Sequence, residues 1–340
     1  MAEDINLLLK MLKENKGNYV SGQEICEMMG VSRTAVWKHV NVLREMGYVI
    51  QSSTKRGYML VKEPDILTYD EVGPYLKTKY IGRNYIYRKS VDSTNTMAKS
   101  LPQDTPEGSL VIAEEQTAGR GRTGKSWESP RNKGIWMSLY LKPDILPQDA
   151  PLITHVAALA VVRAIKSVTG ITPGIKWPND VIIDGKKVCG ILTELNAEMD
   201  CVNYVVVGIG INVNTEKFPD ELKDVATSLL IEYRKIGTHK ARNDTKGLID
   251  RKHLLAEVLN HFEMLYEKFL SGEVADIIRE CKKLSVTLGK SVRIITKGGG
   301  FDAIAVDIDD RGALIVERED GSRQAVIAGE VSVRGVLGYV

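Results

Sequence analysis

Cysteine is scarce in this chain and is never clustered. Only Cys26, Cys189, Cys201 and Cys281 occur among 340 residues, and no two of them form a C-x-x-C pair. Zinc sites and disulfide frameworks need closely spaced cysteines, so this spacing indicates neither. Separate thiols are simplest to explain as reduced side chains, which predicts a cytoplasmic protein.

The chain also lacks a large net charge and a membrane-spanning run. It has 46 Lys and Arg against 44 Asp and Glu, a formal net charge of +2. Any surface that binds nucleic acid must therefore be local, because no field of one sign covers the molecule. No apolar run reaches the length that spans a bilayer, and the acidic start at residues 1–4 does not resemble a signal peptide. We expect no membrane association, and the length predicts two or three domains.

Residues 1–64 have the pattern of a helix-turn-helix domain. A first helix is predicted by apolar residues at helical spacing, which are Ile5, Leu8, Leu9 and Leu12. Ser21 and Glu24 form a capping box at the start of a second helix, which ends at Gly30. Ser32 caps a third helix that Gly47 ends. The apolar stripe of this third helix consists of Val36, Val40, Leu43 and Met46.

The start of the third helix is predicted to face DNA. Recognition helices present their first residues to base edges, and here these are Ser32, Arg33, Thr34, Lys38 and the neighbouring His39. A hairpin predicted from 48–51 and 58–61 has Lys55 and Arg56 at its tip, which suits a wing that contacts phosphate. The alternatives are an ordinary solvated face, and simple packing of Trp37 and His39 at the helix edge. The periodic pattern breaks at 63–65, so we place the end of a winged helix-turn-helix domain at residue 64.

Residues 119–127 form a glycine-rich stretch that satisfies two phosphate-binding patterns. G-x-x-x-x-G-K-S and G-x-G-x-x-G both direct backbone N–H groups and a helix N-terminus at phosphate. No helix fits after these glycines, because Pro130 and Gly134 leave no room for one. What remains is a basic loop with Arg120, Arg122 and Lys125, which either closes over a polyphosphate or stays solvated.

The centre of the chain, residues 65–283, predicts a mixed sheet packed by helices, so the expected fold class is α+β. Strands are expected at 85–91, 109–115, 135–141, 188–196 and 202–212. Helices are expected at 94–100, 152–168 and 254–269. The polar stretch 232–252 is expected to be a loop or an insertion.

Residues 284–340 alternate short apolar runs with turns rich in glycine and aspartate. Strands are predicted at 292–296, 303–307, 313–317, 324–328 and 331–334. Short strands with such turns favour a small SH3-like β-barrel as a third domain.

Distinct motifs surround the glycine-rich loop in a fixed order. They are S-T-N at 93–95, E-E-Q-T-A at 114–118, K-W-P-N-D at 176–180, K-V-C-G-I-L at 187–192 and G-I-G-I-N-V-N at 208–214. In this order and spacing they closely resemble the biotin protein ligases. With the N-terminal segment included, the chain resembles the two-function type that is also the biotin operon repressor. The resemblance covers nearly the whole chain.

The resemblance implies a two-step reaction with biotin and ATP as substrates and Mg²⁺ as the metal. The carboxylate of biotin attacks the α-phosphate of ATP and gives biotinyl-5′-AMP and pyrophosphate. A lysine of a biotin carboxyl carrier protein domain then takes the biotinyl group and releases AMP. Because carboxylate and ATP repel one another, such a site needs cations. The resemblance also implies that biotinyl-5′-AMP acts as corepressor, and that the adenylate-bound homodimer binds operator DNA.

The resemblance assigns a role in the site to individual residues of this chain. For biotin these are Ser93, Thr94, Asn95, Gln116, Arg120, Gly121, Arg122 and Lys187. For ATP and the adenylate they are Arg120, Arg122, Lys176, Asn179, Asp180, Asn212 and Arg334. Lys187 and Arg122 match the residues that serve catalysis, and Asp180 is a candidate ligand of Mg²⁺. Trp177 is a candidate wall of the biotin pocket.

Structural alternatives stay open for several of these residues. Ser93 or Thr94 can cap a helix, and Gln116 can be an exposed strand end. The stretch 176–180 can be a turn with a purely structural role, and Arg334 can be a surface arginine. Two other functions also compete with the ligase and repressor. They are a ligand-sensing repressor without ligase activity, and a lipoate ligase of the same fold superfamily.

Overall fold

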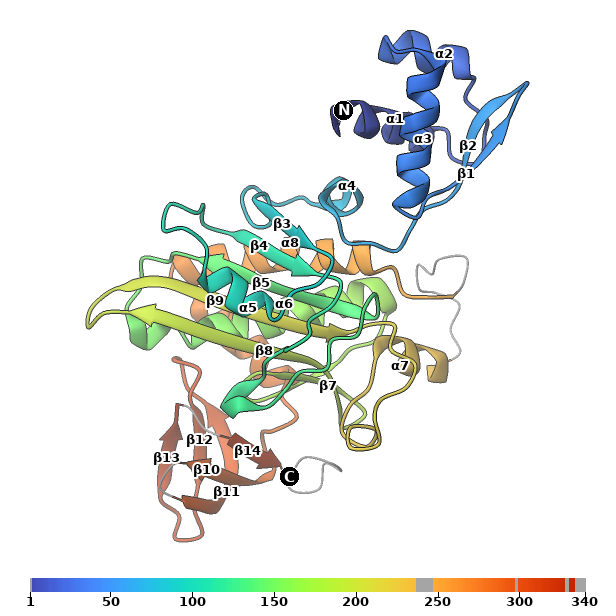
Figure 1. The fold of residues 1–340 in the computed structure, drawn as a ribbon. Helices are drawn as coiled ribbons and strands as arrows, with labels where there is room; N and C mark the ends of the chain where they lie inside the picture. Colours follow the sequence, from blue (N-terminus) through green and yellow to red (C-terminus); the bar gives the residue numbers. More distant parts are fainter. Residues whose placement is uncertain (1, 237–246, 297–298, 328–329, 334–340) are drawn as a thin grey trace. The chain divides into compact units, whose positions relative to one another are not determined.

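The chain forms two compact units, Met1–Ile66 and Leu67–Val340 (Figure 1). The structure is a computed structural model, and it describes residues 2–236, 247–296, 299–327 and 330–333.

The first unit has three helices followed by a hairpin. The elements are α1 (Ala2–Glu14), α2 (Gly22–Met29), α3 (Arg33–Glu45), β1 (Val49–Ser53) and β2 (Gly57–Lys62). The two strands pair antiparallel. The helix-turn-helix and the hairpin predicted after it are therefore both present.

Local capping explains where these helices begin and end. The Ser21 hydroxyl accepts the Glu24 N–H at 3.0 Å, and the Ser32 hydroxyl accepts the Ala35 N–H at 3.3 Å. Gly30 ends α2 with a φ of 65°, a conformation that glycine adopts without steric cost. Both predicted N-caps and the predicted glycine stop are confirmed. Met46, however, is not part of the buried stripe. It follows the last residue of α3, and 50% of its surface is exposed.

Two contacts fix the hairpin to the rest of this unit. Arg44 on α3 donates from Nη2 to the Ile50 carbonyl at 2.8 Å and to the Ser52 hydroxyl at 2.6 Å. Gly57 has a φ of 99°, and a Cβ there would lie 2.0 Å from the Val20 carbonyl oxygen. Only glycine fits this position, so the hairpin runs close against the segment before α2.

A seven-stranded mixed sheet lies at the centre of the second unit. Its strand order is β3-β4-β5-β9-β8-β7-β6, in which β3 and β4 are parallel and the other neighbours are antiparallel. The strands are β3 (Tyr85–Arg88), β4 (Ser109–Ala113), β5 (Gly134–Leu141), β6 (Gly174–Lys176), β7 (Asp180–Ile183), β8 (Lys186–Ala197) and β9 (Val202–Asn212). The predicted mixed sheet is confirmed, and the predicted limits of β9 agree with the structure.

Helices cover the two faces of this sheet unequally. Figure 1 shows α6 (Leu152–Thr169) and α8 (Arg251–Leu270) on one face and the short α5 (Thr94–Lys99) on the other. Side chains of β4 alternate accordingly: Leu110 and Ile112 join the large core, whereas Val111 packs with the α5 side. The remaining helices are α4 (Tyr69–Val72), η1 (Gly73–Tyr75), η2 (Arg122–Gly124), η3 (Pro147–Asp149), α7 (Leu229–Ile236) and α9 (Val274–Leu284).

The start of the stretch 232–252 is helical, which corrects the loop expected there. Helix α7 extends through residue 236. Glu232 is buried, accepts hydrogen bonds from Lys235 at 2.7 and 2.8 Å, and accepts one from the Thr227 hydroxyl at 2.5 Å. A carboxylate satisfied in this way can be buried in a helix, and a reading of polarity alone misses it. Residues 237–246 lie outside the described part of the chain.

One helical stretch, Pro147–Thr169, is long and apolar enough to cross a membrane by length and composition. This differs from the expectation that no such stretch exists. In the fold, 78% of its most apolar window is buried. Its apolar residues pack in the large core between the sheet and α8, as expected for a core helix.

The last part of the second unit is a separate antiparallel sheet. Its strands are β10 (Ser291–Thr296), β11 (Gly299–Ile308), β12 (Leu314–Glu317), β13 (Arg323–Val326) and β14 (Glu330–Val333), in the order β13-β12-β11-β10-β14. Each predicted strand has a counterpart here. Among the described residues no pairing joins β13 to β14, so the closed barrel stays a prediction. Arg334 lies outside the described residues.

Candidate active site

A cavity of about 450 Å³ opens between the 116–128 loop, the first half of β8, the end of β9, and the turn that connects β6 to β7. Its lining includes every residue of the second unit that was predicted to bind biotin or ATP and that the structure describes. These are Ser93, Thr94, Asn95, Gln116, Arg120, Gly121, Arg122, Lys176, Asn179, Asp180, Lys187 and Asn212. Residues separated by up to 119 positions in sequence therefore meet around one space.

Hydrogen bonds at one end of the cavity fix two side-chain amides. The Gln116 Oε1 accepts from the backbone N–H and the hydroxyl of Thr94 at 2.9 and 3.1 Å, and its Nε2 donates to Ser129 at 2.8 Å. The Asn95 Nδ2 donates to Glu194 at 2.8 Å and to the Leu192 carbonyl at 3.2 Å. The orientation of both amides is thereby defined, so each presents a known donor or acceptor to the cavity.

Two residues that the sequence analysis did not single out support this end of the cavity. Ser138, fully buried on β5, donates to the Asn95 Oδ1 at 2.6 Å and lies 2.8 Å from the Thr94 hydroxyl. Glu194 on β8 also pairs with Lys99 at 2.6 Å. Burial alone would raise the pKa of Glu194, but hydrogen bonds from Lys99 and Asn95 outweigh it and hold the pKa below its usual value. A polar residue inside the apolar run 135–141 is the signal that would have found Ser138.

Ser93 has the structural role that the sequence left open. Its side chain accepts the Thr96 N–H at 3.4 Å and caps α5, and it is almost fully buried. It still lines the cavity, so capping and ligand contact do not exclude each other.

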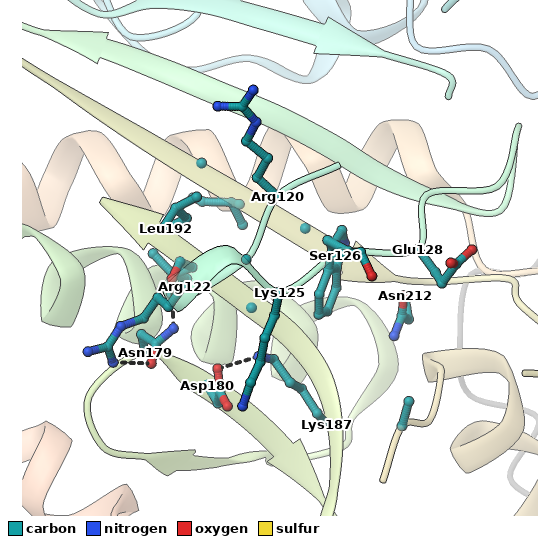
Figure 2. Close-up of a pocket in the computed structure, with 18 of the residues that line it drawn as sticks. Arg120, Arg122, Lys125, Ser126, Glu128, Asn179, Asp180, Lys187, Leu192 and Asn212 are labelled. Carbon is teal, nitrogen blue, oxygen red and sulfur yellow. Dashed lines mark hydrogen bonds and ion pairs between the residues drawn. The ribbon is translucent and has the colours of Figure 1, made fainter. Parts of the chain in front are cut away.

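An ion pair also lines the cavity. The Lys187 Nζ is 2.6 Å from Asp180 Oδ1 and 5.2 Å from the centre of the Trp127 ring (Figure 2). Lys186 instead extends to solvent, where its Nζ donates to the Lys223 carbonyl at 2.7 Å. Neighbouring strand residues face opposite ways, as expected, and Lys187 is the one that points inward.

The glycine-rich loop approaches the same wall. Arg122 donates from Nη1 to Asn179 Oδ1 at 3.0 Å, and the Asn179 Nδ2 donates to the Ile191 carbonyl at 2.8 Å. No helix follows the glycines, as predicted, because only the short η2 forms in the loop before β5. Figure 2 shows the Arg120 side chain directed away from Arg122 and from the Lys187–Asp180 pair. Its guanidinium is therefore not gathered with the other cations in this structure.

Glycines in β8 and β9 make room for Trp127. A Cβ on Gly210 would lie 2.3 Å from the indole Nε1, and one on Gly190 would lie 3.1 Å from Cζ3. The indole packs edge-on to Trp136, with ring centres 6.5 Å apart. The motif containing Trp127 was identified, but its position in the cavity depends on strands more than 60 residues later in the sequence.

The donor set around Asp180 fits Mg²⁺ in one specific way. Among residues 2–236, 247–296, 299–327 and 330–333, no group of three or more His, Cys, Asp or Glu side chains converges on a metal position. Mg²⁺ is commonly held by one or two carboxylates together with substrate phosphates. Asp180, buried at the cavity wall, can supply such a carboxylate only when a phosphate ligand completes the coordination.

The predicted DNA-contacting residues of the first unit divide into two groups. Arg33, Thr34 and Lys38 are exposed on α3, next to the helix cap Ser32. His39 is only 9% exposed, so the structure places its side chain with the buried residues of α3 rather than on the predicted DNA face. Trp37 is 53% exposed, on the same side as the basic residues.

The hairpin tip carries the remaining predicted DNA contacts. Lys55 and Arg56 are exposed. The Arg56 guanidinium lies 4.2 Å from the centre of the Tyr19 ring, which orders this cation.

Comparison with known proteins agrees with this architecture. Residues 5–59 match the model of an HTH domain, 87–212 match the biotin/lipoate A/B protein ligase family, and 287–334 match the biotin protein ligase C terminal domain. The fold and the cavity thus define a protein of the ligase class. A solved biotin protein ligase from Aquifex aeolicus in complex with biotin and ATP is similar, with 31% identity, a TM-score of 0.62, and coverage of 74% of this chain and 99% of that one.

The curated relatives are more specific. The bifunctional ligase/repressor BirA of Bacillus spizizenii is 41% identical over 93% of this chain and 95% of its own length. A biotin–[acetyl-CoA-carboxylase] ligase of Mycobacterium tuberculosis is 32% identical over 70% of this chain and 85% of its own length. This chain belongs to the biotin protein ligase family, and its similarity to the two-function members includes the N-terminal HTH domain.

Proposed function

We propose that this protein activates biotin with ATP to biotinyl-5′-AMP and transfers the biotinyl group to a lysine of a biotin carboxyl carrier protein domain. The observation that carries this proposal is the Lys187–Asp180 pair, which lies in the same cavity as Arg122. A charged pair at the cavity wall and a second cation on the glycine-rich loop suit a reaction between two anions.

The polar end of the cavity fits the ureido ring of biotin. Both Asn95 N–H groups are used within the protein and its Oδ1 already accepts from Ser138, so the second lone pair of Oδ1 is left to accept a ureido N–H. Gln116 has the complementary property, because its Nε2 keeps one N–H for the ureido carbonyl. We propose that Ser93, Thr94, Asn95, Gln116 and Gly121 bind the ring.

In the first step an oxygen of the biotin carboxylate attacks the α-phosphorus of ATP, and the bond to the pyrophosphate leaving group breaks. We place Lys187 between the two anions, where its charge lowers their repulsion; Asp180 holds the ammonium in place. Bound Mg²⁺ supplies additional neutralisation of phosphate charge. Arg120, Arg122, Lys176, Asn179, Asp180 and Asn212 are proposed contacts of ATP and the adenylate, and Arg334 is proposed as a further contact.

In the second step the amine of the acceptor lysine attacks the acyl carbon of the adenylate. The bond to the phosphate oxygen breaks, AMP leaves, and the amine loses a proton to form the amide. Arg122, held by Asn179, closes the loop over the mixed anhydride until the acceptor arrives.

We further propose that the protein is a biotin-dependent repressor in the cytoplasm. Biotinyl-5′-AMP orders the loop and favours a homodimer, which presents two heads to the half-sites of an operator. Ser32, Arg33, Thr34, Lys38, Lys55 and Arg56 are the proposed DNA contacts. Because ligand binding and dimerisation are coupled, each must strengthen the other by the same factor. Sedimentation with and without adenylate tests this, and unchanged self-association would refute the regulatory part.

The proposed domains are a winged helix-turn-helix at 1–64, a catalytic domain at 65–283 and an SH3-like domain at 284–340. Five antiparallel strands of suitable length support the last assignment.

The ligase is tested by measuring pyrophosphate release from ATP in the presence and absence of biotin. Release that requires biotin, followed by biotinylation of an added carrier domain, is the expected result. Release that is independent of biotin would contradict the proposal.

A further inference from the structure

Trp177 is held at two points by residues that follow the catalytic domain. Its backbone N–H donates to the Thr287 hydroxyl at 3.0 Å, and its indole Nε1–H donates to the Gly312 carbonyl at 2.9 Å. Trp177 is 2% exposed and Thr287 is fully buried. Buried hydrogen bonds of this kind are costly to lose, because each leaves a donor without a partner. The position of Trp177 therefore depends on the C-terminal part of the chain.

The segment containing Thr287 runs directly beside the start of the turn. The Val286 N–H donates to the Ile175 carbonyl at 3.0 Å, and Ile175 and Ser285 form a parallel β-bridge. Thr287 thus reaches Trp177 as part of a continuous backbone contact.

Gly312 forms an equally specific contact. Its carbonyl also lies 3.1 Å from the His155 Nε2 on α6. Gly312 has a φ of 79°, and a Cβ there would lie 2.7 Å from the His155 ring. A side chain would therefore both strain the backbone and push this turn away from α6 and Trp177. The ion pair between Lys282 and Asp307, at 2.8 Å, joins α9 to β11, the strand that precedes Gly312.

The residues that follow Trp177 hold the two proposed catalytic side chains. Asn179 accepts from Arg122 at 3.0 Å, and Asp180 pairs with Lys187 at 2.6 Å. Asn179 and Asp180 lie two and three residues after Trp177. A displacement of Trp177 would therefore also shift Asn179 and Asp180, and with them the contacts to the two catalytic side chains.

We propose that Thr287 and Gly312 form a clamp on Trp177, and that this clamp positions the 177–180 turn so that Arg122 and Lys187 meet biotin and ATP correctly. Thr287, Gly312 and Trp177 are positioning residues for adenylate formation, and they act through Asn179 and Asp180. The C-terminal domain therefore contributes to catalysis by holding the 177–180 turn in place. This role is independent of any contact that the domain makes with ATP. This inference rests on the proposed ligase function.

The test is the rate of biotinyl-adenylate formation at saturating biotin and ATP, measured in the full-length protein. Thr287→Val removes the acceptor but keeps the shape, and Trp177→Phe removes the indole donor but keeps an aromatic ring. Each should slow adenylate formation about tenfold or more, since small displacements of reacting groups are costly to rate. Biotin Kd of Thr287→Val should stay within about twofold of the wild-type value, because Thr287 does not line the cavity. Thr287→Ser, which keeps the hydroxyl, should restore the rate.

Thr169→Val is the matched control. Thr169 is also buried and also accepts a backbone N–H, from Ile171 at 3.1 Å, but it does not line the cavity. Its rate should equal that of the wild type. In Thr287→Val/Asn179→Ala the two losses should be less than additive, because both act on the same turn.

Adenylate formation within about twofold of wild type in both Thr287→Val and Trp177→Phe would overturn the clamp. An equal loss in folded Thr169→Val, or strict additivity with Asn179→Ala, would overturn it as well. If Thr287→Val melts far below the wild type, Trp177→Phe and the Thr287→Ser rescue decide the question. A wild-type protein that forms no adenylate would instead refute the ligase itself, and the clamp with it.

Discussion

The ammonium of Lys187 lies 2.6 Å from Asp180, across the tight turn that joins β7 to β8. Two residues with positive φ make this turn, Asp184 at 48° and Gly185 at 78°. The turn pairs Ile182 with Lys187, and a register shift between Val181 and Ile182 then brings Asp180 opposite Gly190, within reach of Lys187. A local feature of the backbone thus orients the cation that the proposed reaction requires.

Lys187→Ala should slow adenylate formation by roughly a hundredfold or more, because a cation that stabilises the transition state is removed. Lys186→Ala is the matched control, since it removes the same charge from the neighbouring residue that points to solvent. Rapid-quench measurement of pyrophosphate release compares the two. A folded Lys187→Ala protein with near-normal release would remove Lys187 from the chemistry.

Arg122→Gly should let biotinyl-5′-AMP escape faster. The substitution removes the contact with Asn179 and the positive charge that closes the loop. Stopped-flow dissociation of the adenylate should show an increased rate, and lysines of bystander proteins should become labelled. Lys125→Ala, which removes another cation of the same loop, should have a smaller effect. Adenylate dissociation unchanged from wild type would mean that Arg122 is only a solvated loop residue.

Arg33→Ala should weaken operator binding and leave adenylate formation unchanged. Arg33 is predicted to face base edges, where an arginine can bind guanine through two parallel hydrogen bonds, and loss of such a contact typically costs about 1–3 kcal/mol. Lys10→Ala is the control, because Lys10 is an exposed cation on α1, outside the predicted DNA face. Titration of operator DNA at fixed salt measures both variants. Equal operator affinities for the two variants would argue against α3 as the recognition helix.

His155 should make the stability of the protein fall in mild acid. Burial lowers the pKa of His155 below its usual value of 6.5, although the contact with the Gly312 carbonyl and the charge of Asp309 oppose this. The folded state therefore binds fewer protons than the unfolded state. The stability that comes from keeping His155 neutral is fully present above about pH 6.5. It is lost as the pH falls below this value, because protonation then favours the unfolded state.

Thermal unfolding between pH 7.5 and 5.5 tests this prediction. The wild type should lose stability as the pH falls, and His155→Gln should lose less. Burial also lowers the pKa of His261, which gives the same sign, so His261→Gln serves as a comparison for one partly exposed histidine. Parallel pH dependence in the wild type and His155→Gln would contradict the role of His155.

Local signals in the sequence predicted much of the fold. The Ser21 and Ser32 caps depend on residues only three positions away, and the structure has both. The alternation around Lys186 and Lys187 likewise follows from one strand. Such features need no information about distant parts of the chain.

Features that depend on distant contacts were missed. Ser138 supports Asn95 from a strand about 40 residues later, and Trp177 is held by Gly312 from more than 130 residues away. Glu232 was missed for another reason: its charge is not typical of a core, but Lys235 and Thr227, only three and five residues away, satisfy it there. In each case the position of the side chain depends on its hydrogen-bond partners, which the pattern of apolar and polar residues does not identify.

The transfer of labelled biotin, compared with labelled lipoate, tests the central claim most directly. The purified protein is incubated with ATP, Mg²⁺ and a biotin carboxyl carrier domain or a lipoyl domain, and label on the acceptor lysine is measured. We predict ATP-dependent transfer of biotin to the carrier domain and no transfer of lipoate. Transfer of lipoate would identify a lipoate ligase, and biotin-dependent operator binding without any transfer would identify a repressor that has no ligase activity; either result would contradict the proposed function.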